Sequence, residues 1–208
     1  MVLKLNRLKV AETLKSIGLT LFTPQEFAGV FKISPNTAAT FIKRNVKSGF
    51  FIKLRNRFYA LKDATLSHFF VANKLYQPSY ISLETALSHY GIIPEVVYTI
   101  TSVSTKPTRE YTTPLGAFSY QLIKREAYRG YQSIQLDGST VLLAEPEKAL
   151  ADYLYFVDIR RSSLNDRLSL KKINRSKLIA YAKIFKRPSL LKLIDTVYVE
   201  QRKPRTIY

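Results

Sequence analysis

The chain has 208 residues, of which 33 are Lys or Arg and 15 are Asp or Glu, so its formal net charge is +18. It contains no Cys, which excludes a disulfide framework, a cysteine-ligated zinc site and a thiol nucleophile. No apolar run exceeds five residues, and Lys4, Arg7 and Lys9 interrupt the leucines of the N-terminus. We therefore expect no membrane span, no signal peptide and a cytoplasmic location.

The positive charge is concentrated at the two ends of the sequence. Residues 1–62 carry 12 basic and 2 acidic side chains, residues 63–158 carry 7 and 10, and residues 159–208 carry 14 and 3. Concentrated positive charge favours a polyanionic partner, because binding releases counterions from phosphates. Solubility through excess charge is the alternative. We predict two domains, residues 1–62 and residues 63–208, the second ending in a basic helical tail over 159–208.

Three helices are predicted before residue 50. Apolar residues at a three-residue spacing predict a first helix that stops at Gly18. These residues are Leu5, Leu8, Ala11, Leu14 and Ile17. Thr23 and Glu26 have the spacing of a capping box, which begins a second helix. Ser34 caps a third helix, and Ile33 is expected to be buried in the tight turn before it.

The third helix has one apolar face and one polar face. The apolar face consists of Ala38, Phe41, Ile42 and Val46. The opposite face offers amide, hydroxyl and cationic groups from Asn36, Thr37, Thr40, Lys43, Arg44 and Lys47. These side chains pair with base edges and phosphates. An ordinary solvated helix is the alternative, but such helices usually mix Glu with Lys. The absence of a carboxylate here favours nucleic acid.

After Gly49 the pattern changes to that of a β-hairpin. Apolar and basic residues alternate from Ile52 to Arg55, and Asn56 is expected to take the left-handed turn conformation. Three helices followed by a basic hairpin are the element order of a winged helix-turn-helix. We expect base contacts from Asn36, Thr37, Thr40, Lys43 and Arg44. We expect phosphate contacts from Ser34, Lys47, Lys53, Arg55 and Arg57.

The rest of the chain mixes helix and strand patterns. Helices are predicted at 66–76 and at 82–90, the latter with Ser82 as its cap. Strands are predicted at 97–103, 109–113, 116–123, 133–136 and 140–144. A helix is predicted from Pro146 to about Phe156, and two further helical patterns follow in the tail. The predicted fold class is α+β, an N-terminal winged helix-turn-helix followed by a mixed α+β domain.

Three segments of the second domain resemble a known family. They read YISLETALSHYGIIP at 80–94, TPLGAFSY at 113–120 and AEPEKALADY at 144–153. In this order behind a winged helix-turn-helix, they are similar to the AbiEi family of antitoxin–transcriptional regulators, and the resemblance covers most of residues 20–156. The wing tip departs from the family pattern, which usually has a Gly before the Tyr where this chain has Phe58 before Tyr59.

The resemblance implies a role in a bacterial toxin–antitoxin module of phage defence. Such proteins bind inverted repeats in their own promoter and repress the operon. They also counter a toxin that resembles a nucleotidyltransferase, either directly or functionally. A stand-alone winged-helix transcriptional regulator is the alternative, as is an interaction module in which the basic faces bind a protein and DNA binding is incidental.

The sequence shows little sign of an active site. The seven Gly form neither a dinucleotide-binding motif nor a P-loop, and His68 and His89 are too few for a histidine-rich metal site. The one acidic group is Glu145, Glu147 and Asp152 with Lys148. It allows a metal-dependent nuclease as a further alternative, but acids at a helix N-terminus are favoured by the helix dipole without any chemistry. We expect no catalysis, no metal and no cofactor.

The basic tail has three interpretations. Its charges extend the DNA footprint, or they meet an acidic protein or RNA, or they form the solvated face of two helices. They include Arg160, Arg161, Lys171, Lys172, Arg175, Lys177, Lys183, Lys186, Arg187 and Lys192.

Overall fold

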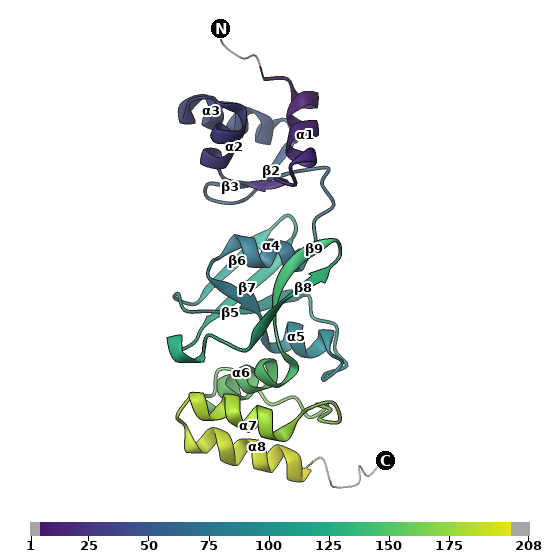
Figure 1. Cartoon of the computed structure of the whole chain (residues 1–208), viewed down its shortest axis with the longest axis vertical. Helices are drawn as coiled ribbons and strands as arrows, with labels where there is room; N and C mark the ends of the chain where they lie inside the picture. Colours follow the sequence, from purple (N-terminus) through teal and green to yellow (C-terminus); the bar gives the residue numbers. More distant parts are fainter. Residues whose placement is uncertain (1–4, 201–208) are drawn as a thin grey trace.

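The computed structural model describes residues 5–200, so the outermost residues of the two predicted domains, 1–4 and 201–208, lie outside it. The molecule is elongated, with the N-terminal elements at one end and the last two helices at the other (Figure 1). Within the described residues, no helix has the length and apolar character needed to cross a membrane.

The N-terminal part consists of three helices and a small sheet. Its elements are α1 (Arg7–Ser16), β1 (Leu21–Phe22), α2 (Pro24–Phe31), α3 (Pro35–Lys47), β2 (Phe51–Arg55) and β3 (Phe58–Leu61). The strands pair antiparallel in the order β1-β3-β2. The predicted start signals are confirmed, because Thr23 and Glu26 form the capping box of α2 and Ser34 accepts a hydrogen bond from the Thr37 amide of α3.

The predicted apolar face of the first helix is wrong in part. Val10 and Leu14 face the core, whereas Leu8 is 67% exposed and the predicted Ile17 is 53% exposed. On an α-helix, residues three positions apart point in directions that differ by about 60°. A long series at this spacing therefore winds around the helix and does not stay on one face. The four-residue pair Val10 and Leu14 keeps to that face. Ile33 is half-buried rather than buried.

Up to residue 200, the C-terminal part contains a mixed sheet and five α-helices. Its first elements are α4 (His68–Leu75), β4 (Ser79–Ile81), α5 (Leu83–His89), β5 (Thr99–Ser104), β6 (Arg109–Thr113) and β7 (Gly116–Leu122). A short 3-10 turn (Arg125–Ala127), β8 (Tyr131–Leu136), β9 (Ser139–Ala144), α6 (Pro146–Asp158), α7 (Arg175–Ile184) and α8 (Pro188–Glu200) follow. The strand order is β6-β7-β5-β4-β9-β8, with β5–β7 and β4–β9 parallel. The chain is therefore α+β, as predicted.

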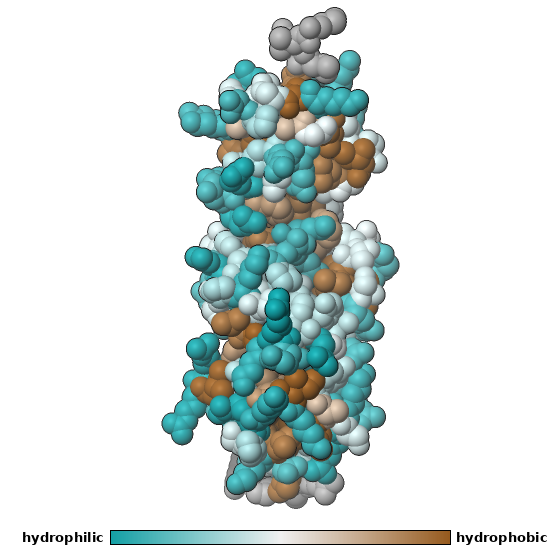
Figure 2. Space-filling model, turned by 60° about the vertical axis from the view of Figure 1, so that its left-hand side comes forward, coloured by the Kyte–Doolittle hydropathy of each residue, from teal (hydrophilic) through white to brown (hydrophobic). Residues whose placement is uncertain are grey.

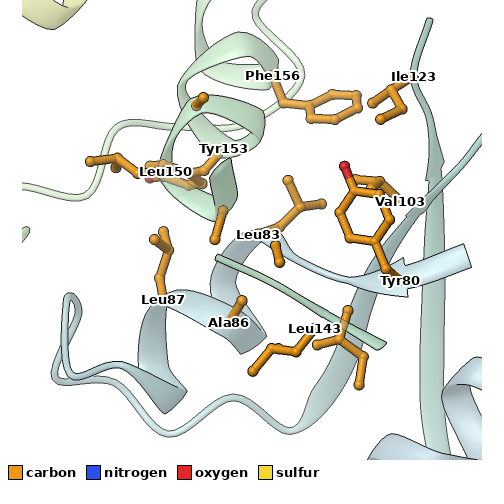
Figure 3. Packing of buried hydrophobic residues seen from close by; sticks show 14 of the residues in the cluster. Tyr80, Leu83, Ala86, Leu87, Val103, Ile123, Leu143, Leu150, Tyr153 and Phe156 are labelled. Atoms are coloured by element: carbon orange, nitrogen blue, oxygen red, sulfur yellow. The ribbon is translucent and has the colours of Figure 1, made fainter. Parts of the chain in front are cut away.

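The buried side chains form two clusters. The N-terminal cluster is built around Phe22, Phe27, Phe41 and Phe51, whose rings pack at 5.1–6.2 Å between centroids. The larger cluster lies between the mixed sheet and the helices α4 to α8. Figure 3 shows the part of it where Leu83 and Leu87 of α5 lie beneath Leu150 and Tyr153 of α6.

The two parts are in contact across the hairpin. The predicted boundary at 62–63 lies between β3 and α4. Leu54 of β2 and Phe58 of β3 nevertheless belong to the larger cluster, so one side of the hairpin packs on the C-terminal part. This contact fixes where the hairpin tip points.

Candidate nucleic-acid interface

The polar face of α3 is directed away from the protein. Ala38, Phe41 and Ile42 are buried against the N-terminal core, which orients the helix about its axis. All six polar residues predicted for the opposite face are exposed, namely Asn36, Thr37, Thr40, Lys43, Arg44 and Lys47. In Figure 2 this end of the molecule carries projecting hydrophilic side chains. The structure thus brings the predicted base-contacting residues together on one accessible surface.

The N-terminus of α3 adds backbone groups to this surface. Pro35 occupies the first turn, and exposed Ser34 caps it with a hydroxyl 2.8 Å from that of Thr37. The unpaired amides of a helix N-terminus attract anions, because they point outward along the helix dipole. Ser34 and Thr37 therefore place two exposed hydroxyls at the end of α3 where the helix dipole favours an anion.

A buried amide that the sequence analysis missed holds α3 in place. Asn45 is 1% exposed, and its Nδ2 atom donates to the Phe41 carbonyl at 2.8 Å. Its Oδ1 atom accepts a 2.7 Å hydrogen bond from Arg7 Nε of α1, and Arg7 Nη2 also donates to Ser48 Oγ at the end of α3. The sequence contained one indication of this role, because Asn45 lies on the same side of α3 as the apolar residues Phe41 and Ile42.

The hairpin places its basic residues differently from one another. Lys53 and Arg57 are exposed. Arg57 takes the left-handed conformation with a φ of 58°, so the prediction that Asn56 would take it is wrong. Lys53 and Arg57 remain available to a phosphate backbone.

Arg55 is turned toward the C-terminal part. Its Nε atom donates to the Leu75 carbonyl of α4 at 2.8 Å, and its guanidinium lies 5.1 Å from the Phe58 ring centroid. Its Nη1 atom donates to the Asn56 carbonyl at 3.1 Å. The structure therefore engages Arg55 within the protein, at the junction of the two parts, rather than grouping it with Lys53 and Arg57.

The acidic group around α6 holds helices together. Asp152 is fully buried and forms an ion pair with equally buried Lys148, and it accepts hydrogen bonds from Tyr80 at 3.0 Å and Ser82 at 2.8 Å. Burial raises the pKa of Asp152, while Lys148 and the two hydroxyls act in the opposite direction. Ser82 precedes α5 but makes no side-chain capping bond, so its predicted role is corrected: its hydroxyl binds Asp152 instead.

The other two carboxylates bind the tail. Glu145 accepts from the Tyr181 hydroxyl and pairs with Lys177 at 3.0 Å, and these two partners hold its pKa below the usual range. Glu147 accepts a 3.1 Å hydrogen bond from the backbone amide of Asn174, and its Oε2 atom lies 3.5 Å from Lys177 Nζ. In residues 5–200 no three His, Asp or Glu side chains are placed to hold a metal ion. Glu145 and Glu147 therefore have a structural role, because their contacts hold α7 against α6.

The three segments that carry the family resemblance meet in the C-terminal core. Tyr80 and Ser82 of the first segment bind Asp152 of the third, across 72 and 70 residues of sequence. Tyr120 of the second segment is fully buried and donates to the Ala72 carbonyl at 2.7 Å. The first and third segments are therefore joined by buried hydrogen bonds, and the second packs into the same core.

The basic tail lies far from α3. Helices α7 and α8 form the opposite end of the elongated molecule (Figure 1). A duplex bound to α3 reaches them only if it runs along the length of the protein.

Comparison with known proteins does not assign the chain to a family. No family model matches the chain, and the search of curated proteins found no match.

Proposed function

We propose that the N-terminal part is a winged helix-turn-helix that binds double-stranded DNA. In this proposal α2 and α3 form the helix-turn-helix, α3 enters the major groove, and the β2–β3 hairpin is the wing beside it. One observation carries the proposal: the residues of the outward face of α3 are exposed and offer amide, hydroxyl and cationic groups without a carboxylate. Among residues 1–62 only Glu12 and Glu26 are acidic.

The residues divide into two proposed roles. Asn36, Thr37, Thr40, Lys43 and Arg44 contact base edges, because they lie along the face that meets the groove floor. Ser34, Lys47, Lys53 and Arg57 contact phosphates at its margins. Arg55, predicted with them, instead supports the wing through the Leu75 carbonyl.

We further propose that the protein represses its own promoter and serves as the antitoxin of a toxin–antitoxin module. This step is supported by the resemblance to the AbiEi family and by the packing of the three resembling segments into one core, where Tyr80 and Ser82 bind Asp152. The toxin would be a nucleotidyltransferase-like protein that is countered directly or functionally. A dimer or a pair of monomers on an inverted repeat supplies the two recognition helices.

Two experiments test these proposals separately. Fluorescence anisotropy with DNA from the region upstream of the gene tests DNA binding, with a random duplex of equal length as control. Co-expression with the neighbouring gene tests the antitoxin role by the growth of the host. Growth arrest that the chain relieves supports the role; a neighbouring gene that is harmless alone, or equally toxic in both strains, contradicts it.

A further inference from the structure

A cleft of about 380 Å³ lies between α4 and the β8–β9 hairpin, away from α3. Small-molecule sites in proteins usually occupy about 300–1,000 Å³. The cleft is therefore large enough for a compact organic ligand.

The two tyrosines that line the cleft pack on a buried tyrosine of the core. The Tyr131 ring stacks on Tyr80 with centroids 4.6 Å apart and planes inclined by 19°. Tyr128 lies 5.3 Å from Tyr131 and 5.1 Å from Tyr80. Tyr80 is fully buried and bonded to Asp152, so it cannot move without disturbing the core. Tyr128 and Tyr131 thus give the cleft a rigid aromatic wall, which suits a flat ring.

The opposite wall, formed by α4, is also fixed. The Asn73 side chain bonds both the amide and the carbonyl of Leu142, at 2.6 and 3.3 Å, as a neighbouring strand would. These two bonds join α4 to β9 at Leu142. The three-residue strand β4 does not reach this position, because it pairs with β9 only at Leu143. Phe70 of α4 lines the cleft beside it.

The charge of the cleft is positive. Its lining includes no Asp or Glu, and Lys74 is its one charged residue, with Nζ 5.6 Å from the Phe70 ring centroid. Gln77 and Thr140 add an amide and a hydroxyl. Burial raises the pKa of Tyr128, so its hydroxyl adds no negative charge to the cleft. A cation and neutral donors without an acid favour an anionic group on the ligand.

We propose that this cleft binds a planar aromatic ring that carries an anionic group, with the ring between Phe70 and Tyr131 and the anion at Lys74. Mononucleotides and aromatic carboxylates share this chemistry. The site is independent of the DNA-binding proposal, because none of its residues belongs to α3 or to the β2–β3 hairpin.

NMR titration of the ¹⁵N-labelled full chain tests the site with adenosine 5′-monophosphate and with indole-3-acetate. Adenosine and indole serve as their uncharged counterparts. We expect saturable shifts in segments 70–79, 128–131 and 140–142 with at least one anion, and weaker binding of its counterpart. The anion that binds identifies the ligand class. Shifts centred on 36–47, or no saturable shifts with either anion, would overturn the proposal.

Lys74→Met tests the charge, and Lys106→Met is its matched control. Lys106 also lies over an aromatic ring, 5.8 Å from the Tyr76 centroid, but outside the cleft. We expect Lys74→Met to weaken binding about tenfold and Lys106→Met to leave it unchanged. Because Lys74 is exposed, the variant should keep the wild-type spectrum elsewhere. Equal affinity of wild type and Lys74→Met, or equal affinity for charged and uncharged probes, would refute the assignment. Thr140→Trp, which fills the cleft, should abolish binding in a chain that still melts cooperatively.

Discussion

Arg7 of α1 donates a 2.7 Å hydrogen bond from Nε to the Oδ1 atom of Asn45, which is buried in α3. This bond and the packing of Phe41 on Phe27 hold the polar face of α3 outward. The same helix therefore carries two asparagines with different tasks: Asn45 supports the helix, and Asn36 is exposed on its outer face.

Asn45→Ala should lower the free energy of unfolding by about 1–3 kcal/mol, because it removes bonds to Arg7 and to the Phe41 carbonyl inside the protein. Asn36→Ala is the matched control and should change the stability by less than about 0.5 kcal/mol. Urea denaturation followed by circular dichroism measures both. Equal stability of the two variants would contradict the assigned role of Asn45.

Lys47→Ala should weaken binding to promoter and random DNA by the same factor. Lys47 is exposed in the last turn of α3, and we propose that it contacts the phosphate backbone rather than base edges. The slope of log K against log salt should become shallower by about one unit. Anisotropy titrations at several salt concentrations give both quantities. A loss confined to promoter DNA would show that Lys47 reads bases.

Arg55→Ala should lower the stability of the protein, since it breaks the bond from β2 to the Leu75 carbonyl. We expect a loss of about 1 kcal/mol, because Arg55 is only half-buried. Lys53→Ala, in the same strand but exposed, should leave stability unchanged and weaken DNA binding. Thermal unfolding and anisotropy of the two variants separate the roles. If Arg55→Ala affected DNA binding alone, Arg55 would be a phosphate contact as the sequence predicted.

The contacts of Glu145 predict a dependence of stability on pH. Its pKa is lowered in the folded chain by Tyr181 and Lys177, so it stabilises the fold above its unfolded pKa and loses this contribution as pH falls through the folded value. Tyr181→Phe should raise the pKa of Glu145. The stability difference between wild type and variant should therefore shrink under acidic conditions.

An NMR titration of the Glu145 side-chain carbon measures this pKa directly. Tyr98→Phe is the control, because Tyr98 is 90% exposed. A titration midpoint that is the same in Tyr181→Phe and in wild type would show that the hydroxyl does not act on Glu145.

Local signals in the sequence predict most of the elements. The capping box of Thr23 and Glu26 and the Ser34 cap depend on residues a few positions apart, and both are found. The two helical patterns of the tail are found as α7 and α8, with Leu178, Phe185 and Ile194 buried. At these positions, interactions between residues close in sequence are sufficient to predict the element.

The contacts that complete the candidate site join distant segments, and no local pattern encodes them. Arg55 reaches an acceptor 20 residues away, Arg7 reaches one 38 residues away, and Ser82 binds Asp152 instead of capping α5. Each depends on how the hairpin or a helix packs on another element. Sequence periodicity therefore predicts which residues face outward on α3 but not what holds that helix in place.

The most direct measurement compares wild type, Asn36→Ala and Arg44→Ala on promoter DNA and on a random duplex, at one salt concentration. We predict that each variant loses about 1–3 kcal/mol of binding free energy on promoter DNA and much less on random DNA, since both side chains read base edges. The stability of both variants should match that of wild type. Equal losses on the two duplexes, or wild-type affinity of both variants for promoter DNA, would contradict the placement of α3 in the major groove.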